Sequence, residues 1–398
     1  MRHDTTTRIL SREVIVSNDS LVTGLNNNDI IIGSSGSGKT RSYVLPNLLH
    51  AEGVSLIVCD TKGKLLKESA PTLKKKGYQI WHLDFTDCLH SPYGYNPLGA
   101  IRYEEKNDTF YEQDILKLSS ALIPIENRDD IFWDLAARQY LDAIVGYMLC
   151  ALPFSEHHLM TAKSLLFQMH TGNFTKLIDQ LNEEKPDCFA VRQYEMIAAN
   201  QKAEKMDASI KGVLGEKLNT YIFDGALSLY QNPKKIDVAA LRKAPVAVFL
   251  SVSDTDRSMD KLASLFFTQA LSGLCNTPIP EDKSEPFYPV QLYLDDFASG
   301  IRIPDFDSVI SITRSRHIGV SIILQSLSQL ESLYGIPASK TILNNFNHML
   351  YLGGTDVDTC RYIGVRADKS AQAVLSLPLD EAWLFERGKR SAPGEKVR

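Results

Sequence analysis

The chain has 398 residues, of which 44% are hydrophobic and 23% are charged, and it carries a formal net charge of -5 at pH 7. This composition is that of an ordinary soluble protein. It excludes a surface that is basic throughout and built for constant nucleic-acid binding, although a local basic patch is compatible with it. The length predicts two or three domains with a large core.

The six cysteines are scattered and form no C-x-x-C pair, which predicts reduced thiols in a cytoplasmic compartment and neither a disulfide framework nor a zinc site. Residues 1–28 are polar and lack the apolar core of a signal peptide. The longest apolar-rich stretch, residues 140–154, is too short to span a membrane and contains Asp142. The sequence therefore predicts a soluble chain without a transmembrane segment.

The most informative stretch is a glycine-rich loop that fits the phosphate-binding pattern G-x-x-x-x-G-K-[ST]. It lies between a short apolar run, residues 29–32, and a helical stretch, residues 41–49, which Pro46 is expected to bend or end early. A strand before the loop and a helix after it are the context that the pattern requires; a flexible loop without a ligand is the competing interpretation. The predicted nucleotide-binding residues are Gly33, Ser34, Ser35, Gly36, Ser37, Gly38, Lys39 and Thr40.

Each part of this loop has its own predicted role in holding ATP and Mg²⁺. Glycines let backbone N–H groups turn inward, and the following helix directs its positive end at the phosphates. Lys39 is expected to reach the β and γ phosphates, where it would take part in catalysis. The hydroxyl of Thr40 is expected to bind Mg²⁺.

Strand-like and helical segments alternate around the loop, which predicts an α/β fold with a largely parallel sheet. Asp60-Thr61-Lys62-Gly63 follows one of the strands, at the edge where open α/β sheets bind ligands, or else forms a charged turn. Residues 388–398 are polar and are expected to fray. The predicted strands are residues 13–17, 29–33, 54–60, 77–84, 246–253, 290–297, 319–325, 348–353 and 382–386.

Residues 113–229 have helical spacing almost throughout and show no strand signal, so they predict an all-α domain inserted into the α/β domain. We therefore assign residues 1–100 and 231–398 to the nucleotide-binding domain and residues 101–230 to the insert. Trp133 either belongs to the core or is a surface aromatic that stacks on a base or a neighbouring subunit. One apolar helix face is expected to comprise Phe132, Leu135, Ala136, Tyr140, Ile144, Val145 and Met148.

An apolar strand ends in two carboxylates, Asp295 and Asp296, which is the arrangement that holds Mg²⁺ and a catalytic water in P-loop NTPases. Asp295 is predicted to bind the metal. Asp296 is predicted to polarise the attacking water, because a carboxylate within hydrogen-bond reach can accept its proton or orient it. Alone, such a strand end is more often a capped turn, but downstream of a phosphate loop it favours catalysis.

Gln325 ends the next strand, from where its amide could sense the γ-phosphate. Arg314 and Arg316 lie just before that strand, and either is a candidate arginine finger, supplied in cis or by an adjacent subunit. We expect Arg314 to act in trans and to lie near the nucleotide-side rim of the sheet. A solvated cation at a helix end is the alternative for both residues.

These motifs resemble, in order along nearly the whole chain, those of the type IV secretion coupling proteins, the TraG/TraD-type ATPases of bacterial conjugation. The late string Leu324-Gln325-Ser326-Leu327-Ser328-Gln329-Leu330 is specific beyond generic P-loop features. The other matching stretches are residues 33–40 with Pro46-Asn47-Leu48, Asp60-Thr61-Lys62-Gly63, Tyr95-Asn96-Pro97-Leu98, Phe132-Trp133 and Leu294-Asp295-Asp296-Phe297-Ala298.

The resemblance implies a RecA-like P-loop NTPase domain with an inserted all-α domain, assembling as a homo-hexamer at the cytoplasmic face of the bacterial inner membrane. It also implies that the protein recruits relaxase-bound DNA, single-stranded in the family, or effector proteins to the components of the secretion channel. ATP hydrolysis is thought to drive the transfer.

Two features depart from the family. Its members usually carry Asp-Glu where this chain has Asp295-Asp296, and the missing methylene removes roughly 1.5 Å of reach, which puts the hydrolysis rate in question. Members also usually begin with transmembrane helices, so this chain is either a trimmed soluble part, monomeric by itself, or a member without an anchor. Two alternatives stay open: an FtsK/HerA-type double-stranded DNA translocase, and a nucleotide-gated cargo adaptor with little hydrolysis.

Overall fold

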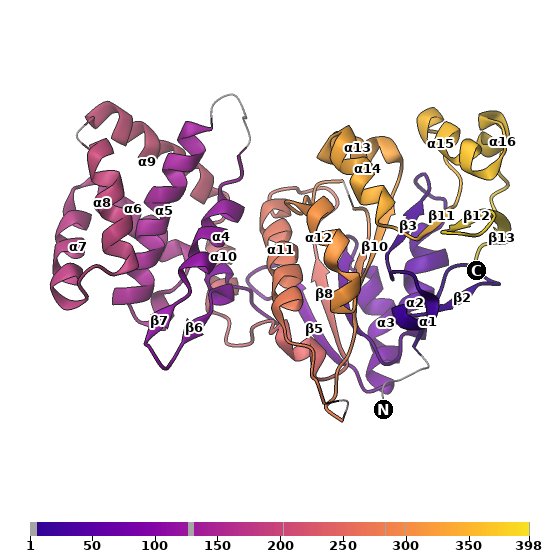
Figure 1. Cartoon of the computed structure of the whole chain (residues 1–398), viewed down its shortest axis with the longest axis horizontal. Coiled ribbons are helices and arrows are strands. Elements are labelled where there is room, and N and C mark those ends of the chain that lie inside the picture. Colours follow the sequence, from indigo (N-terminus) through magenta and orange to yellow (C-terminus); the bar gives the residue numbers. More distant parts are fainter. Residues whose placement is uncertain (1–5, 126–130, 202, 283, 298, 398) are drawn as a thin grey trace. The chain divides into compact units, whose positions relative to one another are not determined.

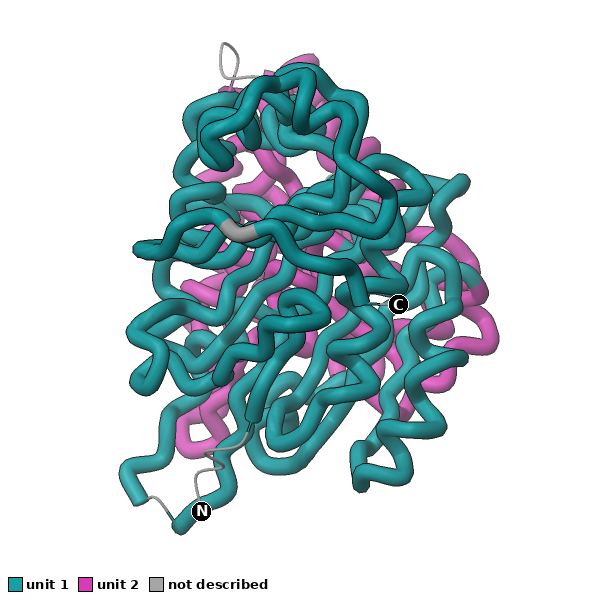
Figure 2. Tube along the Cα trace, turned by 90° about the vertical axis from the view of Figure 1, so that its right-hand side faces the viewer, with its two compact units in different colours: residues 1–86, 236–263, 270–398 teal, residues 87–235, 264–269 magenta. Residues whose placement is uncertain are grey.

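The computed structural model describes residues 6–125, 131–201, 203–282, 284–297 and 299–397. The chain divides into two compact units, one made of residues 1–86, 236–263 and 270–398 and the other of residues 87–235 and 264–269 (Figure 2). The first unit carries the main sheet and the second is mostly helical. That the helical unit is a domain of its own, with borders near residues 101 and 230, stays a prediction.

A mixed sheet dominates the first unit (Figure 1). Among the described residues it has nine strands in the order β13-β12-β11-β3-β10-β9-β4-β8-β5, and only β12 and β13 run antiparallel to their neighbours. The prediction of an α/β fold with a largely parallel sheet is therefore confirmed. The strands are β3 (Asp29–Ile32), β4 (Ser55–Asp60), β5 (Gln79–Asp84), β8 (Val246–Ser251), β9 (Val290–Leu294), β10 (Ile318–Leu324), β11 (His348–Tyr351), β12 (Glu381–Glu386) and β13 (Ala392–Glu395).

The central strands are apolar runs without alternation because both faces of the sheet are covered. Every residue of β3, β4, β8, β9 and β10 is buried. One face packs against Tyr43, Val44 and Leu48, next to the glycine-rich loop, and against Leu65 and Leu73 of α3. The helices of this unit are α1 (Ser20–Thr23), α2 (Leu45–His50), α3 (Lys64–Lys75), α11 (Asp260–Asn276, except residues 264–269, which belong to the second unit), α12 (Phe306–Ile312), α13 (Leu327–Tyr334), α14 (Ile336–Asn344), α15 (Val357–Ala367) and α16 (Ala371–Leu375).

Pro46 shapes the helix after the loop but does not end it. The helical segment begins with a π-helical turn, Thr40–Val44, in which the N–H of Leu45 donates to the carbonyl of Thr40, and α2 then continues to His50. Pro46 lies in the first turn of α2, where a missing N–H is tolerated. In place of a bend at Pro46, the helix has a π-helical turn just before the proline. The expectation that Pro46 ends the helix early is wrong, because α2 continues to His50.

The helical unit consists of seven helices and a short hairpin in the part of the chain that is described. No helix among the described residues has the length and the apolar character needed to cross a membrane. The elements are β6 (Tyr103–Glu104), β7 (Thr109–Phe110), α4 (Glu112–Leu122), α5 (Phe132–Ala151), α6 (Leu159–His170), α7 (Asn173–Glu184), α8 (Phe189–Gln201), α9 (Glu204–Asn219) and α10 (Asp224–Gln231).

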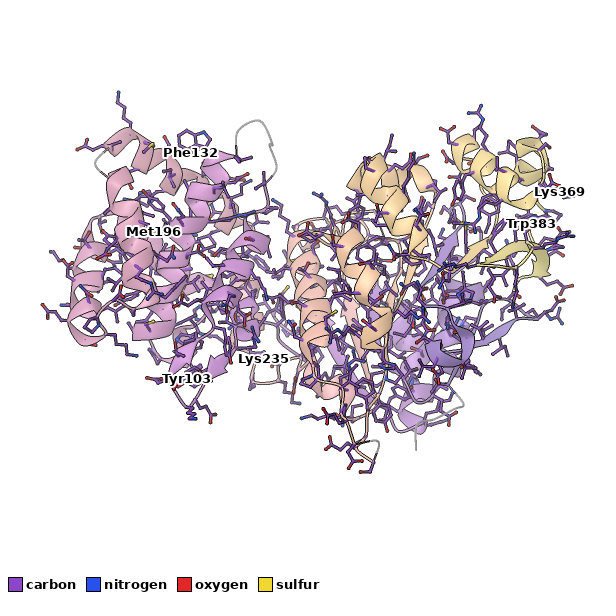
Figure 3. All side chains as sticks on the ribbon, viewed as in Figure 1. Tyr103, Phe132, Met196, Lys235, Lys369 and Trp383 are labelled. Carbon is purple, nitrogen blue, oxygen red and sulfur yellow. The ribbon has the colours of Figure 1, made fainter. Side chains whose placement is uncertain are left out.

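The predicted apolar face of α5 is only partly buried. Five of its members lie in the core, but Phe132 and Leu135, in the first turn of the helix, are 46% and 41% exposed. Phe132 is labelled at this end of the helical unit in Figure 3. Trp133 is half-buried and packs edge-on against the Phe132 ring, with ring centroids 5.2 Å apart.

The C-terminal segment, as far as residue 397, is not a frayed tail. Residues 392–395 form β13, which pairs antiparallel with β12 in a register that places Glu395 opposite Glu381. After it, the side chain of Lys396 is buried inside the α/β unit. The prediction failed because an edge strand can have the same polar composition as a disordered terminus.

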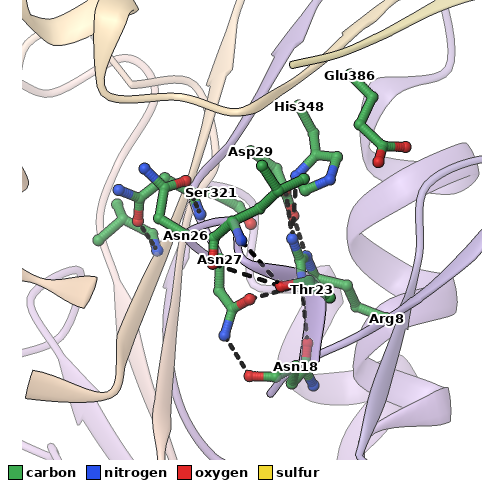
Figure 4. A network of polar contacts seen from close by, with 12 residues as sticks. Arg8, Asn18, Thr23, Asn26, Asn27, Asp29, Ser321, His348 and Glu386 are labelled. Carbon is green, nitrogen blue, oxygen red and sulfur yellow. Dashed lines mark hydrogen bonds and ion pairs between the residues drawn. The ribbon is translucent and has the colours of Figure 1, made fainter. Parts of the chain in front are cut away.

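A buried polar network fixes the beginning of β3 (Figure 4). The N-terminal hairpin, β1 (Thr7–Ile9) with β2 (Ile15–Ser17), supplies Arg8, whose guanidinium donates to both carboxylate oxygens of Asp29, at 2.6 and 3.0 Å. Nδ1 of His348 on β11 lies 3.0 Å from the same carboxylate. The hydroxyl of Tyr43 donates to Asp29 Oδ2 at 2.6 Å, so this network reaches the helical turn that follows the loop.

Candidate nucleotide-binding site

The glycine-rich loop is held at its root by the strands on either side of β3. The N–H of Gly33 donates to the carbonyl of Leu324 at the end of β10, at 3.1 Å. The N–H of Ser34 donates to the carbonyl of Gly353, just after β11, at 2.9 Å. A side chain at Gly33 would collide with that of Ser37, and Gly38 has a φ of 91°, so both positions require glycine. The loop therefore has a defined shape set by its neighbours.

The side chain of Lys39, near the C-terminal end of the loop, reaches back to the residues that begin the loop. Its Nζ donates to the carbonyls of Gly33 and Ser34, at 2.6 and 3.0 Å. Burial lowers the pKa of Lys39, while the nearby carboxylates of Asp296 and Asp295 raise it again. The structure thus brings the ammonium group into the loop and close to both acidic residues of the β9 end.

Thr40 and Asp295 are in direct contact. The Thr40 hydroxyl donates to Asp295 Oδ2 at 2.9 Å, because β9 and β3 flank β10 in parallel register and end at the same edge of the sheet. Burial raises the pKa of Asp295 to about 6, and the charge of Asp296 adds to the rise. A hydroxyl and a buried carboxylate are oxygen ligands of the kind that Mg²⁺ takes together with phosphate oxygens, so these two residues fit the metal.

Asp296 follows directly and lies half-buried. Its backbone has a φ of 51°, a left-handed conformation that aspartate tolerates better than most residues, and its N–H donates to Asp295 Oδ1 at 3.2 Å. This turn separates the two carboxylates, so that only Asp295 contacts Thr40. Ala298, the last residue of this motif, lies outside the described residues.

Gln325 is close to the loop, as expected. It follows β10, whose last residue, Leu324, pairs with Ile32 immediately before Gly33. Its N–H donates to Oε1 of Gln329 at 3.2 Å, which links two glutamines of the late motif across the first turn of α13. The strand end and the loop root are therefore neighbours, and the role of Gln325 at the γ-phosphate stays a prediction.

Arg314 lies elsewhere, and the expectation that it borders the nucleotide-side rim is wrong. It begins a 3₁₀ turn, Arg314–Arg316, that precedes β10, and its Nη2 donates to the carbonyl of Ser20 at 3.4 Å. The seven residues of β10 separate it from the loop by roughly 20 Å. A segment that leads into a parallel strand lies at the amino edge of the sheet, whereas the phosphate loop lies at the carboxyl edge. The trans role predicted for Arg314 therefore depends on how subunits assemble, and Arg316 shares this location.

Asp60 in the Asp60-Thr61-Lys62-Gly63 motif has a structural role at the same edge. Its buried carboxylate accepts hydrogen bonds from the N–H groups of Lys62 and Leu66, at 3.4 and 2.9 Å, and so caps the start of α3. Lys62 is exposed but close enough to Lys39 to lower its pKa. The charged-turn interpretation holds for Asp60, and Lys62 adds a second cation near the loop.

Sequence reasoning missed Lys396, whose Nζ donates to the carbonyl of Ser37 within the loop, at 3.1 Å. No sequence motif includes Lys396, and a single lysine in a polar segment gives no pattern from which its position could be predicted. Only the pairing of β13 with β12 places it there.

A glycine-rich loop between a parallel strand and a helix, with a lysine folded over it and a threonine against the acidic end of a nearby strand, defines a P-loop NTPase. The chain belongs to the type IV secretory system conjugative DNA transfer family, whose pattern it matches over residues 5–369. No protein with a curated description matches the sequence.

Solved structures agree on the fold. The bacterial conjugative coupling protein TrwBdeltaN70, in its unbound form, superposes with a TM-score of 0.73 at 15% sequence identity, covering 100% of this chain and 90% of that one. The plasmid coupling protein TrwB in complex with ADP and Mg²⁺ gives a TM-score of 0.69 at 16% identity, covering 93% and 85%. VirB4 of Thermoanaerobacter pseudethanolicus gives 0.59 at 14% identity, covering 100% and 97%. The α/β unit therefore has the RecA-like P-loop ATPase fold that the sequence predicted.

Proposed function

We propose that this protein is an ATP-hydrolysing coupling protein of a type IV conjugative secretion system. It binds ATP and Mg²⁺ at residues 33–40 and uses hydrolysis to drive the transfer of DNA or protein substrates. The contact between Thr40 and Asp295 supports this proposal most directly, because it pairs the two oxygen ligands that a magnesium nucleotide needs beside a loop of the right shape.

The roles of the residues follow from their positions. Backbone N–H groups of residues 33–40 and the Lys39 ammonium bind the phosphates, and Thr40 with Asp295 holds the metal, which neutralises charge on the transferred phosphoryl group. Asp296 orients the attacking water. Gln325, at the tip of the strand between the loop and the two carboxylates, senses the γ-phosphate.

We expect ATP with Mg²⁺ to stabilise the folded protein, because a ligand that binds only the folded state must do so. At a concentration 100 times the dissociation constant, the free energy of unfolding should rise by about 2.7 kcal/mol, which a thermal-shift titration detects. Lys39→Ala should remove most of this gain, and Lys74→Ala, which changes an exposed lysine of α3, should leave it intact. A Lys39→Ala protein that gains as much as the parent would show that the loop is not the nucleotide site.

The raised pKa of Asp295 predicts that the binding of Mg²⁺ depends on pH. Because Mg²⁺ binds the carboxylate, protonation below about pH 6 competes with the metal, and the Mg²⁺-dependent part of the ATP-induced thermal shift should decline between pH 7 and pH 5. Without metal, the stability of the folded protein should depend on pH in the opposite direction. Between about pH 4 and about pH 6 the folded protein retains a proton on Asp295 that the unfolded chain has lost, so the contribution of Asp295 to the free energy of unfolding falls as the pH rises.

The control for this pH series is Asp295→Asn, which cannot titrate. Its Mg²⁺-dependent shift should be smaller than that of the parent, and the pH dependence that remains should be that of the nucleotide itself. Identical pH profiles for the parent and for Asp295→Asn would separate Asp295 from metal binding.

Family membership supports the partners and the location that belong to the same proposal. The helical unit contacts relaxase-bound DNA or effector cargo, and the protein assembles as a hexamer at the cytoplasmic face of the inner membrane, beside the secretion channel. The aromatic pair Phe132 and Trp133, at the exposed start of α5, is a suitable contact surface for such a partner.

Turnover separates this function from its alternatives. A motor hydrolyses ATP faster in the presence of its substrate, single-stranded DNA or a cargo protein, whereas an adaptor binds nucleotide and turns over slowly with or without it. A translocase of the FtsK/HerA type responds to double-stranded DNA instead. Measuring ATP hydrolysis with each kind of substrate therefore discriminates the three.

A further inference from the structure

The buried side chain of Lys396 connects the last strand of the chain to the phosphate loop. Lys396 is 8% exposed, and its backbone N–H donates to the carbonyl of Asp380, which fixes it beside β12. Its Nζ donates to two carbonyls: that of Leu352 at 2.8 Å and that of Ser37 at 3.1 Å. One ammonium group thus joins β13, the end of β11 and the middle of the loop.

The contact with Ser37 decides where the next N–H points. In a trans peptide the carbonyl of one residue and the N–H of the next lie in the same plane and point in opposite directions across the C–N bond. When Lys396 holds the Ser37 carbonyl on one side of the loop, the N–H of Gly38 is turned to the other side. The positive charge of Lys396 also favours this orientation of the peptide dipole, because it lies at the negative end.

The contact with Leu352 supports the other half of the loop. Gly353, the residue after Leu352, accepts the hydrogen bond from the N–H of Ser34, and the N–H of Leu352 itself donates to Ile32 at the end of β3. Lys396 therefore binds to the segment that holds the loop root as well as to the loop itself. The N–H of Ser37 adds an internal bond to Ser34, at 3.1 Å, so that both ends of this short stretch are fixed.

Lys396 and Lys39 hold different carbonyls. Lys39 contacts those of Gly33 and Ser34, whereas Lys396 contacts that of Ser37, and Lys396 reaches the loop from another element of the fold. Burial lowers the pKa of Lys396 while the charge of Asp380 raises it. A buried ammonium group that is shared between two carbonyls is costly to place, which argues for a task beyond general packing.

We propose that Lys396 is a positioning residue of the nucleotide site, which holds the Ser37 carbonyl so that the N–H of Gly38 is aimed at a bound phosphate. The inference rests on the proposed function in one respect, namely that residues 33–40 bind a nucleotide. Because such an N–H contacts the phosphate chain before and during the reaction, Lys396 contributes to binding more than to the chemical step.

The test is Lys396→Met, which keeps an unbranched side chain, one heavy atom shorter, and removes the charge and the donors. Binding of ADP with Mg²⁺, measured by calorimetry on the full chain, should weaken about tenfold, the loss expected for one charge-assisted hydrogen bond. In steady-state hydrolysis KM should rise by a similar factor while kcat changes less than threefold. Inorganic pyrophosphate should show the same loss as ADP, because the contact is with phosphate. Lys396→Arg, which keeps the charge and the donors, should recover part of the affinity.

Lys389→Met is the matched control. Lys389 lies in the same C-terminal segment, its side chain is 68% exposed, and it pairs with Glu386 at 2.8 Å, so its substitution should leave ADP binding unchanged. If Lys396→Met does not fold, Lys396→Gln, which keeps a donor but loses the charge, takes its place and should show a loss of the same direction.

The outcomes separate this proposal from the proposed function. A parent protein that binds neither ADP nor pyrophosphate contradicts the function itself. A parent that binds both, with a folded Lys396→Met or Lys396→Gln protein that binds them equally well, overturns the role of Lys396 alone. A variant with a lowered melting temperature and an unchanged dissociation constant would likewise overturn it, since that result shows packing without positioning.

Discussion

An Asp296→Asn protein is expected to bind ATP with Mg²⁺ almost as well as the parent and to lose about 10² to 10⁴ in kcat, the range that a positioned acid or base contributes. In the proposed site Asp295 holds the metal, and its carboxylate accepts the hydrogen bond from Thr40, so the amide at position 296 leaves that contact in place. An amide cannot accept a proton from water. The measurement is the steady-state hydrolysis rate together with the dissociation constant of a non-hydrolysable analogue.

The control for Asp296→Asn is a substitution at a second aspartate that has the same left-handed backbone conformation. Asp305 also has a φ of 51°, it is exposed, and it is the N-cap residue of α12. Asp305→Asn makes the same chemical change in the same conformation and should keep parental turnover. Undiminished turnover in Asp296→Asn would remove Asp296 from the mechanism.

Asp296→Glu asks whether the departure from the family's Asp-Glu pair limits the rate. The longer side chain restores roughly 1.5 Å of reach towards the water, so kcat should equal or exceed that of the parent. The left-handed backbone at this position adds a cost that the sequence did not show. Glutamate tolerates it less well than aspartate, so the variant should lose about 1 kcal/mol of unfolding free energy.

The sequence was sufficient to predict those features of the fold that depend on a hydrophobic pattern or a known motif. Apolar runs predicted the buried strands, and the motifs predicted a glycine-rich loop between a strand and a helix, with Thr40 and Asp295 close together. These features are local or follow from the rule that parallel strands end at one edge. The order of the strands in the sheet had no comparable signal.

Three of the failures concern which edge or which face of an element a residue occupies. Arg314 was expected at the rim of the nucleotide site, although a residue that precedes a parallel strand lies at the opposite edge. Lys396 was assigned to a frayed segment because edge pairing through β12 is not visible in its composition. Phe132 and Leu135 fit the helical period of the apolar α5 face, but periodicity does not show where along a helix that face becomes buried.

The N-terminal hairpin also had no motif, and its role rests on one buried ion pair. Burial alone would raise the pKa of Asp29, but the charge of Arg8 and the hydrogen bond with His348 hold it below its usual value. The pair therefore contributes stability that is present above the usual aspartate pKa and is lost as the pH falls towards the lowered one. Since Asp29 opens the strand that leads into the phosphate loop, this stability bears on the site.

Arg8→Met is accordingly expected to reduce the unfolding free energy by about 3 to 5 kcal/mol, the loss found when one partner of a buried pair is removed. The methionine fills similar space but leaves the Asp29 carboxylate charged, buried and short of two donors. Urea denaturation followed by circular dichroism measures the change. The double variant Arg8→Met/Asp29→Asn should regain part of the loss, because the amide carries no charge that needs a partner.

The comparison that isolates burial is Arg12→Met. Arg12 lies in the same N-terminal segment and pairs with Glu395 at 2.5 Å, but their side chains are 65% and 58% exposed. Water and salt screen such a pair, so its removal should cost less than about 1 kcal/mol. If Arg8→Met proves as mild as Arg12→Met, the hairpin does not secure the start of β3 through this pair. If it is severe and the double variant recovers, the cost lies in the unpaired Asp29 charge at the root of the strand that carries the phosphate loop.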